Sequence, residues 1–184
     1  AFVQTLREAQ TKYGIDGFKF DAADFDFYPE DAIAAGGSVS GAEQCSMFVR
    51  CAEKYAYNEL RAGWKNAGKA IVQRLHDKMH SWEDLQKLIP EMFAEALLGY
   101  SFSCPDMVGG GDFSAFTDIE SVDQDLIVRS AQCHALLPMV QFSLAPWRVL
   151  DENHYAAVLR AMDIRSKHSQ LIKTLFERAA TTGE

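Results

Sequence analysis

Short apolar runs alternate with stretches of helical periodicity along the chain, and this alternation narrows the possible folds more than any other feature. Apolar runs bounded by turn residues predict strands at 17–20, 69–75, 100–104 and 139–144. Amphipathic stretches predict helices at 2–13, 42–65, 82–98, 119–137 and 153–179. Such alternation favours an α/β fold with parallel strands covered by helices. Four strand–helix units suit half of an eight-unit barrel or a small open sheet, and the pattern does not choose between them.

Length and charge restrict the class of protein. The 184 residues suit a single domain over 1–184, and 48% hydrophobic and 24% charged residues are ordinary for a globular protein. A formal charge of −8 disfavours nucleic acid as a partner. No apolar run approaches the roughly 18 residues of a membrane span, and residues 1–10 lack the order of a signal peptide.

The four cysteines do not form a recognisable scaffold. Cys45, Cys51, Cys104 and Cys133 show no CxxC spacing, which argues against a disulfide framework or a structural metal site. Reduced thiols are therefore expected, and this favours a cytosolic location. Cys104 follows a predicted strand and could act as a nucleophile, but a buried structural thiol is the stronger interpretation.

An aspartate follows each of the first three predicted strands within two residues: Asp21, Asp77 and Asp106. In parallel strands these carboxylates meet at one end of the sheet, where catalytic groups of barrels lie. Converging carboxylates suit glycoside hydrolysis and also a magnesium site. For Asp21 the structural alternative is equally weighted: the residue caps a turn, or it pairs with Lys19 or Arg74.

Two further patterns have a functional and a structural interpretation. His76 and His80 are four residues apart with an acid between them, which resembles a zinc-binding pattern, whereas the structural alternative is a polar pocket or its rim. Gly109–Gly111 has neither dinucleotide nor P-loop spacing, so the glycines indicate positive φ or close backbone approach.

Several motifs together resemble a known family. The stretches KYGIDGFKFDAAD, RAGWK, QRLHDKMHSW, LLGYSFSCPDMVGGG and PMVQFSLAPWR occur in this order over nearly the whole chain. They resemble the catalytic barrel of glycoside hydrolase family 31, most closely its α-galactosidase-like and myogenesis-regulating-glycosidase-like branch. The resemblance implies the C-terminal part of a (β/α)8 barrel and a retaining α-glycosidase without a metal or other cofactor.

The resemblance also implies roles for individual residues. Asp21 matches the nucleophile and Asp77 the general acid/base. The implied substrate-binding residues are Lys19, Arg61, Arg74, Asp106 (in the floor of the sugar site) and Trp147, with Arg148 beside it. Ala23 stands where the family usually has glycine, so the turn after the nucleophile is expected to differ.

The resemblance covers only part of a family member. A family 31 barrel begins before the nucleophile strand and is flanked by β-domains, so this chain would hold the fourth to eighth strands. The remainder of the barrel and the β-domains are expected in the parent protein. The implied partner is a carbohydrate, with an α-galactoside favoured. The alternatives are a sugar-binding or inactive barrel fragment and, less favoured, a divalent-metal hydrolase using Asp21, Asp77, His76 and His80.

Overall fold

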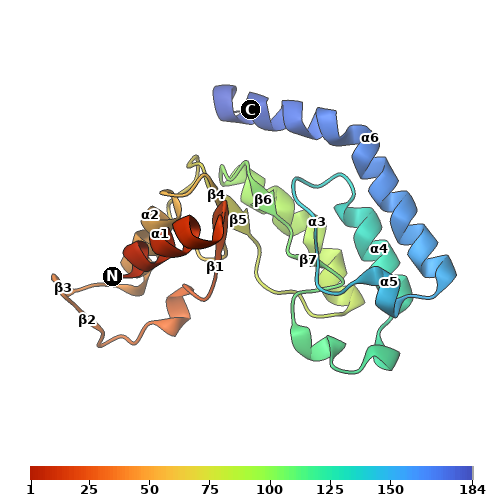
Figure 1. The fold of residues 1–184 in the computed structure, drawn as a ribbon, viewed down its shortest axis with the longest axis horizontal. Helices are drawn as coiled ribbons and strands as arrows, with labels where there is room; N and C mark the ends of the chain where they lie inside the picture. Colours follow the sequence, from red (N-terminus) through yellow and green to blue (C-terminus); the bar gives the residue numbers. More distant parts are fainter. Residues whose placement is uncertain (184) are drawn as a thin grey trace. The chain divides into compact units, whose positions relative to one another are not determined.

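A computed structural model describes residues 1–183 (Figure 1). The chain divides into two compact units, residues 1–74 and residues 75–184, and each unit is described by itself below. Parallel strands alternate with helices, so the predicted α/β class is confirmed. The strand–helix order is consistent with part of a barrel.

The first unit is a small parallel sheet with two helices. Its strands are paired in the order β1–β4–β5, and both pairings are parallel. The elements are α1 (Phe2–Tyr13), β1 (Gly17–Phe20), η1 (Phe25–Phe27), β2 (Ile33–Ala34), β3 (Gly37–Ser38), α2 (Gly41–Ala52), β4 (Tyr57–Leu60) and β5 (Val72–Arg74). The predicted stop of the first helix is confirmed, because Gly14 adopts a left-handed conformation with φ 67°.

An aromatic cluster forms the centre of the first unit. The rings of Phe18 and Tyr55 meet edge to face at 4.9 Å, and those of Phe20 and Phe48 do so at 5.5 Å. Edge-to-face pairs of this kind each add roughly 0.5–1.5 kcal/mol beyond burial. The cluster packs β1 against α2 and so fixes the strand that precedes Asp21.

The segment between β1 and α2 contains more structure than the predicted loop. β2 and β3 form a short antiparallel hairpin. Ser40 then begins α2 with a capping box, in which its hydroxyl accepts from Glu43 N–H and the Glu43 carboxylate accepts from Ser40 N–H.

The predicted helix over 42–65 is wrong in its second half. The helix ends at Ala52, and residues 57–60 form the central strand β4. The sequence did not indicate this strand, because the polar residues Asn58 and Glu59 also fit the polar face of a helix. In the structure Asn58 bonds the carbonyl oxygens of Tyr55 and Ala70, and Glu59 is buried with cationic partners. Tertiary contacts therefore override the local pattern.

As far as residue 183, the second unit contains one long α-helix, three shorter ones, two 3-10 helices and short strands. β7 and β8 pair in parallel. The elements are α3 (Trp82–Leu97), β6 (Ser103–Cys104), β7 (Met107–Val108), η2 (Phe113–Phe116), η3 (Ile119–Ser121), α4 (Gln124–His134), β8 (Gln141–Phe142), α5 (Pro146–Val149) and α6 (Glu152–Thr182). The predicted strands at 69–75, 100–104 and 139–144 are thus present but shorter. The helix predicted at 119–137 begins later because the Asp123 carboxylate caps it by accepting from Leu126 N–H.

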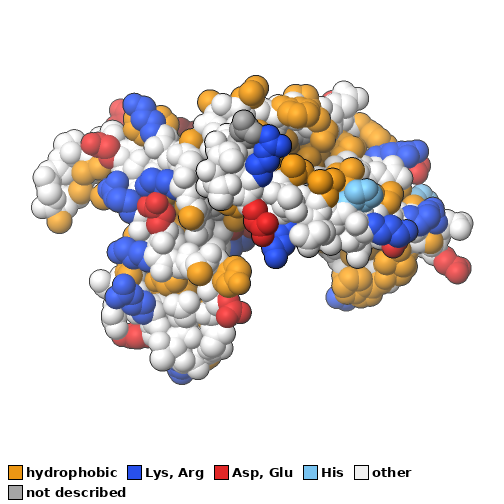
Figure 2. All heavy atoms as spheres, turned by 90° about the horizontal axis from the view of Figure 1, so that it is seen from above, with side chains coloured by type: hydrophobic (Ala, Val, Ile, Leu, Met, Phe, Trp, Pro, Cys, Tyr) orange, Lys and Arg blue, Asp and Glu red, His pale blue; other side chains and the backbone are white. Residues whose placement is uncertain are grey.

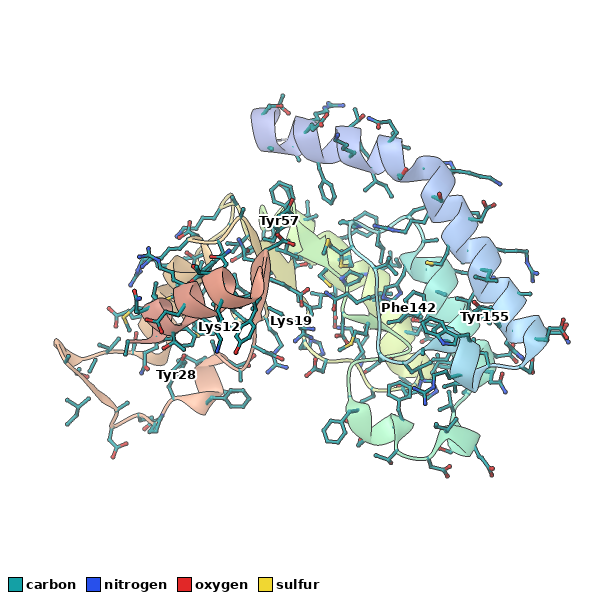
Figure 3. The ribbon with its side chains drawn as sticks, viewed as in Figure 1. Lys12, Lys19, Tyr28, Tyr57, Phe142 and Tyr155 are labelled. Atoms are coloured by element: carbon teal, nitrogen blue, oxygen red, sulfur yellow. The ribbon has the colours of Figure 1, made fainter. Side chains whose placement is uncertain are left out.

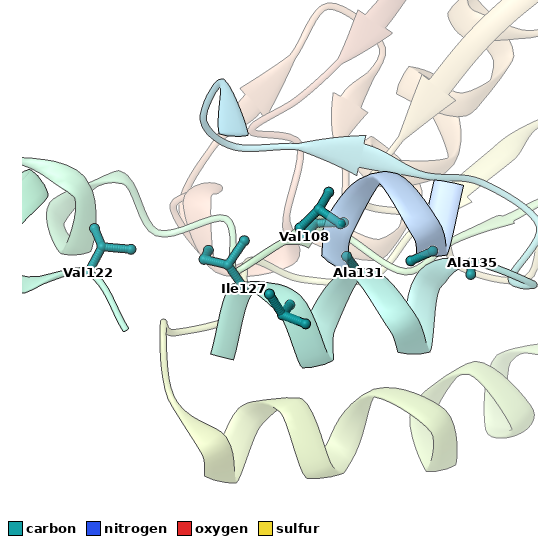
Figure 4. Packing of buried hydrophobic residues seen from close by; sticks show 8 residues of the cluster. Val108, Val122, Ile127, Ala131 and Ala135 are labelled. Carbon is teal, nitrogen blue, oxygen red and sulfur yellow. The ribbon is translucent and has the colours of Figure 1, made fainter. Parts of the chain in front are cut away.

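The core of the second unit lies between α4, α6 and the β7–β8 pair (Figure 4). Val108, Ile127 and Ala131 are almost fully buried there. Arg165 of α6 donates to the carbonyl oxygens of Leu137 and Pro138, at 2.6 and 2.9 Å. These bonds satisfy main-chain groups beyond the end of α4 and tie α6 to this core.

The surface carries both charged and hydrophobic side chains (Figure 2). Exposed hydrophobic residues include Ile33 in the first unit, and Phe113 and Leu97 in the second. No helix within residues 1–183 is long and apolar enough to cross a membrane.

The pairing of β1 with β4 predicts that replacement of Gly17 by a larger residue destabilises the protein. A Cβ atom at Gly17 would overlap the carbonyl oxygen of Tyr57 on β4. We expect Gly17→Ala to lower the free energy of unfolding by about 2–3 kcal/mol, because the overlap lies between two backbones. Urea denaturation measures this change. The matched control is Gly36→Ala, whose Cβ would meet nothing within 4 Å, and equal effects of the two variants would contradict the observed register.

Candidate functional site

Asp21 lies directly after β1, with its side chain 48% exposed. Its Oδ1 atom accepts from Ala22 N–H at 2.9 Å and lies 3.3 Å from Arg74 Nη2 and 3.5 Å from Arg61 Nε. The hydrogen bond and both ion-pair distances involve Oδ1, and about half of the Asp21 side chain is exposed. The pairing of Asp21 with Arg74, which the structural interpretation predicted, is present, and the catalytic role of Asp21 stays a prediction.

The strand register brings the two arginines to Asp21. Phe20 is paired with Leu60, and Leu60 is paired with Gln73, so the next residue of each strand emerges at the same edge. Those next residues are Asp21, Arg61 and Arg74. Parallel pairing alone thus explains why two guanidinium groups meet one carboxylate.

An alternating chain of charges continues from Asp21 in both directions. Arg61 Nη2 donates to Asp24 Oδ2 at 2.7 Å. Arg74, with its side chain 1% exposed, places Nε 3.2 Å from Glu59 Oε1. Lys19 lies opposite Glu59 in the β1–β4 register, with Nζ 3.4 Å from the same oxygen (Figure 3 labels Lys19). Each buried charge therefore has an opposite neighbour, as burial requires.

The loop after Asp21 is fixed by two further contacts. Ala22 has φ 59°, an uncommon conformation for a residue with a side chain, and Ala23 is buried. The Cys45 thiol donates to Ala23 O at 2.9 Å. Burial, followed by the charge of Asp24, raises the pKa of the Cys45 thiol, so this thiol remains protonated as a structural donor.

Asp77 lies in the second unit, in the segment between β5 and α3, and is exposed. Its charge acts on the nearby Asp112 carboxyl, whose pKa is nevertheless lowered, chiefly by hydrogen bonds from Ser114. Asp106 is fully buried, and its Oδ2 accepts from Lys78 N–H at 2.8 Å. The structure thus places Asp106 against the main chain that follows Asp77.

Trp147 lies on α5 with 68% of its surface exposed. It lines an apolar groove of about 490 Å³ together with Phe142 and Tyr155, which are labelled in Figure 3. In the chain, Trp147 lies shortly after β8, which is the place after the last strand that the resemblance implies for it.

The two histidines have different surroundings. His80 Nε2 accepts from Asp123 N–H at 3.0 Å, so Nδ1 carries the proton and donates to Gly109 O at 2.7 Å. His76 is exposed. In the described part of the chain, no group of three or more His, Cys, Asp or Glu residues is arranged to hold a metal ion. His80 therefore serves to connect loops of the second unit.

Other predictions about single residues are settled by burial and backbone geometry. Cys104 is fully buried, which supports a structural thiol. Gly109 and Gly110 have φ 89° and 102°, as positive φ in the glycine run predicts. Trp82 donates its indole N–H to Asp123 Oδ2 at 2.9 Å, which links the start of α3 to the residue that caps α4.

Sequence reasoning did not identify Glu59, Asp24 or Lys78 as parts of these networks. Glu59 lay within a predicted helix, and its burial is visible only through the pairing of β4. The run of acids after β1 gave a signal for Asp24, because it lies three residues from Asp21. Lys78 carried no signal beyond its place beside Asp77.

A buried acid in α3 predicts a pH dependence of stability. Burial raises the pKa of Glu95 to about 7, against opposing effects of a Ser103 hydrogen bond and the charge of Lys78. Since the folded pKa exceeds the ordinary value of 4.5, Glu95 stabilises the fold fully below about pH 4.5, and this contribution is lost as pH rises through 7. We expect Glu95→Gln to remove this loss.

The measurement is urea denaturation of both proteins at pH 5 and pH 8. Wild type should lose on the order of 2 kcal/mol relative to Glu95→Gln between these values. Glu120→Gln, at an exposed position, is the control and should follow wild type. Parallel pH profiles for wild type and Glu95→Gln would show that Glu95 is not protonated in the folded protein.

Comparisons with known proteins give two curated matches. The chain is 30% identical over 168 residues to myogenesis-regulating glycosidase of Mus musculus, covering 85% of this chain and 24% of that protein. It is 28% identical over 149 residues to SITS-binding protein of Tetronarce californica, covering 79% of this chain and 21% of that protein. The chain thus spans about a quarter or less of the length of these relatives. No protein-family model matches it.

Proposed function

We propose, from the similarity to these two relatives, that the chain belongs to the myogenesis-regulating-glycosidase-like branch of glycoside hydrolase family 31 and carries the catalytic acids of a retaining α-glycosidase. The enzyme removes terminal α-linked sugars and favours α-galactosides. The carbohydrate is its partner. The remaining barrel strands and flanking β-domains belong to the rest of a longer protein in this proposal.

The state of Asp21 is the observation that carries the proposal. A nucleophilic carboxylate must be ionised, oriented and open to the substrate. Asp21 is half-exposed, and two guanidinium groups and one main-chain N–H hold its Oδ1. The other oxygen, Oδ2, is left to attack the anomeric carbon. Arg61 and Arg74 therefore act as anchors for the nucleophile in this proposal.

Asp77 supplies the proton chemistry. As Asp21 Oδ2 bonds to the anomeric carbon, the glycosidic bond breaks and the leaving oxygen takes the proton of Asp77. The Asp77 carboxylate then removes a proton from water, and the resulting hydroxide attacks the anomeric carbon and releases Asp21. This scheme requires the two carboxyl groups to lie about 5–5.5 Å apart in the active protein.

The alternative function is carbohydrate binding without hydrolysis. One of the two relatives is named for binding a compound rather than for hydrolysis, so its name does not imply turnover. The two functions differ in turnover, since a binding protein would retain a sugar without releasing a cleaved product.

The first test of the proposal is replacement of the nucleophile. We expect Asp21→Asn in the complete protein to lower kcat on aryl α-galactosides at least about 1,000-fold, because the amide cannot form the glycosyl ester. Asp21→Gly leaves space at this position, so added azide should restore turnover of an aryl α-galactoside with an activated leaving group by attacking the anomeric carbon in place of the carboxylate. Product analysis should then show a galactosyl azide of inverted configuration.

The matched control is Asp26→Asn, which changes an exposed aspartate of the same loop. This variant should keep the activity of wild type. Aryl α-glucosides measured in parallel test the choice of sugar. Normal turnover by Asp21→Asn would contradict the assignment, and absence of turnover by folded wild type on both sugars would favour the binding protein.

A further inference from the structure

Lys78, the residue directly after Asp77, has both of its main-chain groups fixed by one loop. Its N–H donates to Asp106 Oδ2 at 2.8 Å. Its carbonyl oxygen accepts from Gly111 N–H at 3.0 Å and from Asp112 N–H at 3.1 Å. Three hydrogen bonds therefore define the peptide planes on either side of Lys78, including the plane that Asp77 shares.

The side chain of Lys78 is fixed from another element. Only 5% of it is exposed, and Nζ lies 2.5 Å from Glu91 Oε2 on α3. A buried ammonium group is retained only where an opposite charge compensates its lost hydration. Lys78 is thus attached to α3 through its side chain and to the 106–112 loop through its backbone.

Asp106 is a buried residue with an uncommon backbone conformation. It is 0% exposed, and its φ of 73° is uncommon for a residue other than glycine. A buried carboxylate must receive hydrogen bonds in place of its hydration, and Lys78 N–H supplies one. The contact of Asp106 with a sugar, which the resemblance implies, stays a prediction, whereas its bond to Lys78 N–H is present in the structure.

The adjacent glycines allow the two loops to approach. A Cβ atom at Gly110 would lie 2.7 Å from Lys78 O, and one at Gly111 would lie 2.7 Å from both carboxylate oxygens of Asp106. Both distances are too short for carbon and oxygen atoms in contact. The glycine run is thus required by the packing of one backbone against the other.

We propose that Asp106, acting through the main chain of Lys78, is a positioning residue that orients Asp77 for proton transfer. This inference rests on the proposed function, in which Asp77 is the general acid/base. Asp106 touches neither the sugar nor the leaving group. It holds the peptide that follows Asp77 and so sets the direction in which the Asp77 side chain leaves the backbone.

Proton transfer is the step most sensitive to such an arrangement. The donor carboxyl must lie within hydrogen-bond reach of the leaving oxygen, and a displacement of about 1 Å can lower the rate about 100-fold. A leaving group that departs without a proton does not depend on this alignment. The dependence of the loss on the leaving group therefore separates positioning of Asp77 from contact with the sugar.

The experiment compares wild type and Asp106→Asn as complete proteins. Asparagine keeps the size of the side chain and tolerates positive φ, so the change weakens the bond to Lys78 N–H with little steric effect. We expect kcat/KM for phenyl α-galactoside to fall about 10- to 100-fold, and kcat/KM for 2,4-dinitrophenyl α-galactoside to stay within about threefold. The dissociation constant for galactose should stay within about twofold, since a positioning residue makes no sugar contact.

Two results would overturn the inference. Equal losses for both leaving groups with weakened galactose binding would show that Asp106 contacts the sugar, and unchanged kcat/KM for both would show that it does not position Asp77. Asp118→Asn is the matched control, because this carboxylate caps an exposed turn by accepting from Glu120 N–H. It should leave both substrates unaffected.

A second variant preserves the charge in case Asp106→Asn does not fold. Gly111→Ala pushes a methyl group against the Asp106 carboxylate without removing it. It should produce the same leaving-group dependence with a smaller loss of about 3- to 10-fold. Thermal melting of each variant identifies any that is unfolded, and a folded Gly111→Ala protein without leaving-group dependence would contradict the inference.

Asp77→Asn separates failure of the inference from failure of the proposed function. If Asp77→Asn shows strong leaving-group dependence but Asp106→Asn does not, only the positioning role is wrong. If Asp77→Asn hydrolyses both substrates as wild type does, the acid/base assignment itself is wrong and the inference falls with it. The corresponding α-glucosides and glucose replace the galactose probes if wild type prefers them.

Discussion

Arg74 is buried between Asp21 and Glu59, and the candidate nucleophile depends on this arrangement. The parallel register of β1, β4 and β5 brings Asp21, Arg61 and Arg74 to one edge. Once there, the charges need one another, because an unpaired guanidinium at this depth would be costly. The Glu59 carboxylate compensates the charge of the buried guanidinium at Nε of Arg74. Nη2 of the same group then lies beside Oδ1 of the half-exposed Asp21 carboxylate. The sheet register and the chemistry of Asp21 are thus parts of one arrangement.

In the second unit, buried groups likewise fix the main chain beside the candidate residue Asp77. Asp77 is exposed, yet the residue after it is fixed through both backbone groups and a buried ammonium. Asp106, Glu91 and the glycine run supply the partners and the space. In both units, buried charges and close backbone contacts fix the main chain beside an exposed carboxylate, to which the proposed function gives a catalytic role.

The sequence predicted those features that depend on local pattern. Helix α1 with its Gly14 stop, strand β1 and helix α3 were found from periodicity and turn residues. Strand β4 was missed because its acidic residue is buried by ion pairs that only the sheet creates. The candidate acids were predicted because they follow strands, whereas the bond of Asp106 to Lys78, 28 residues away, could not be read from the sequence.

In the proposed function Asp21 forms a covalent bond to the sugar, and this bond can be trapped. The complete protein is incubated with 5-fluoro-α-galactosyl fluoride and, separately, with its glucosyl counterpart. Intact mass and peptide mapping then locate any adduct. A single fluorosugar on Asp21 is expected, with faster labelling by the galactosyl reagent. An adduct on another carboxylate, or hydrolysis of an α-glycoside with no adduct from the matching reagent, would contradict the proposed role of Asp21.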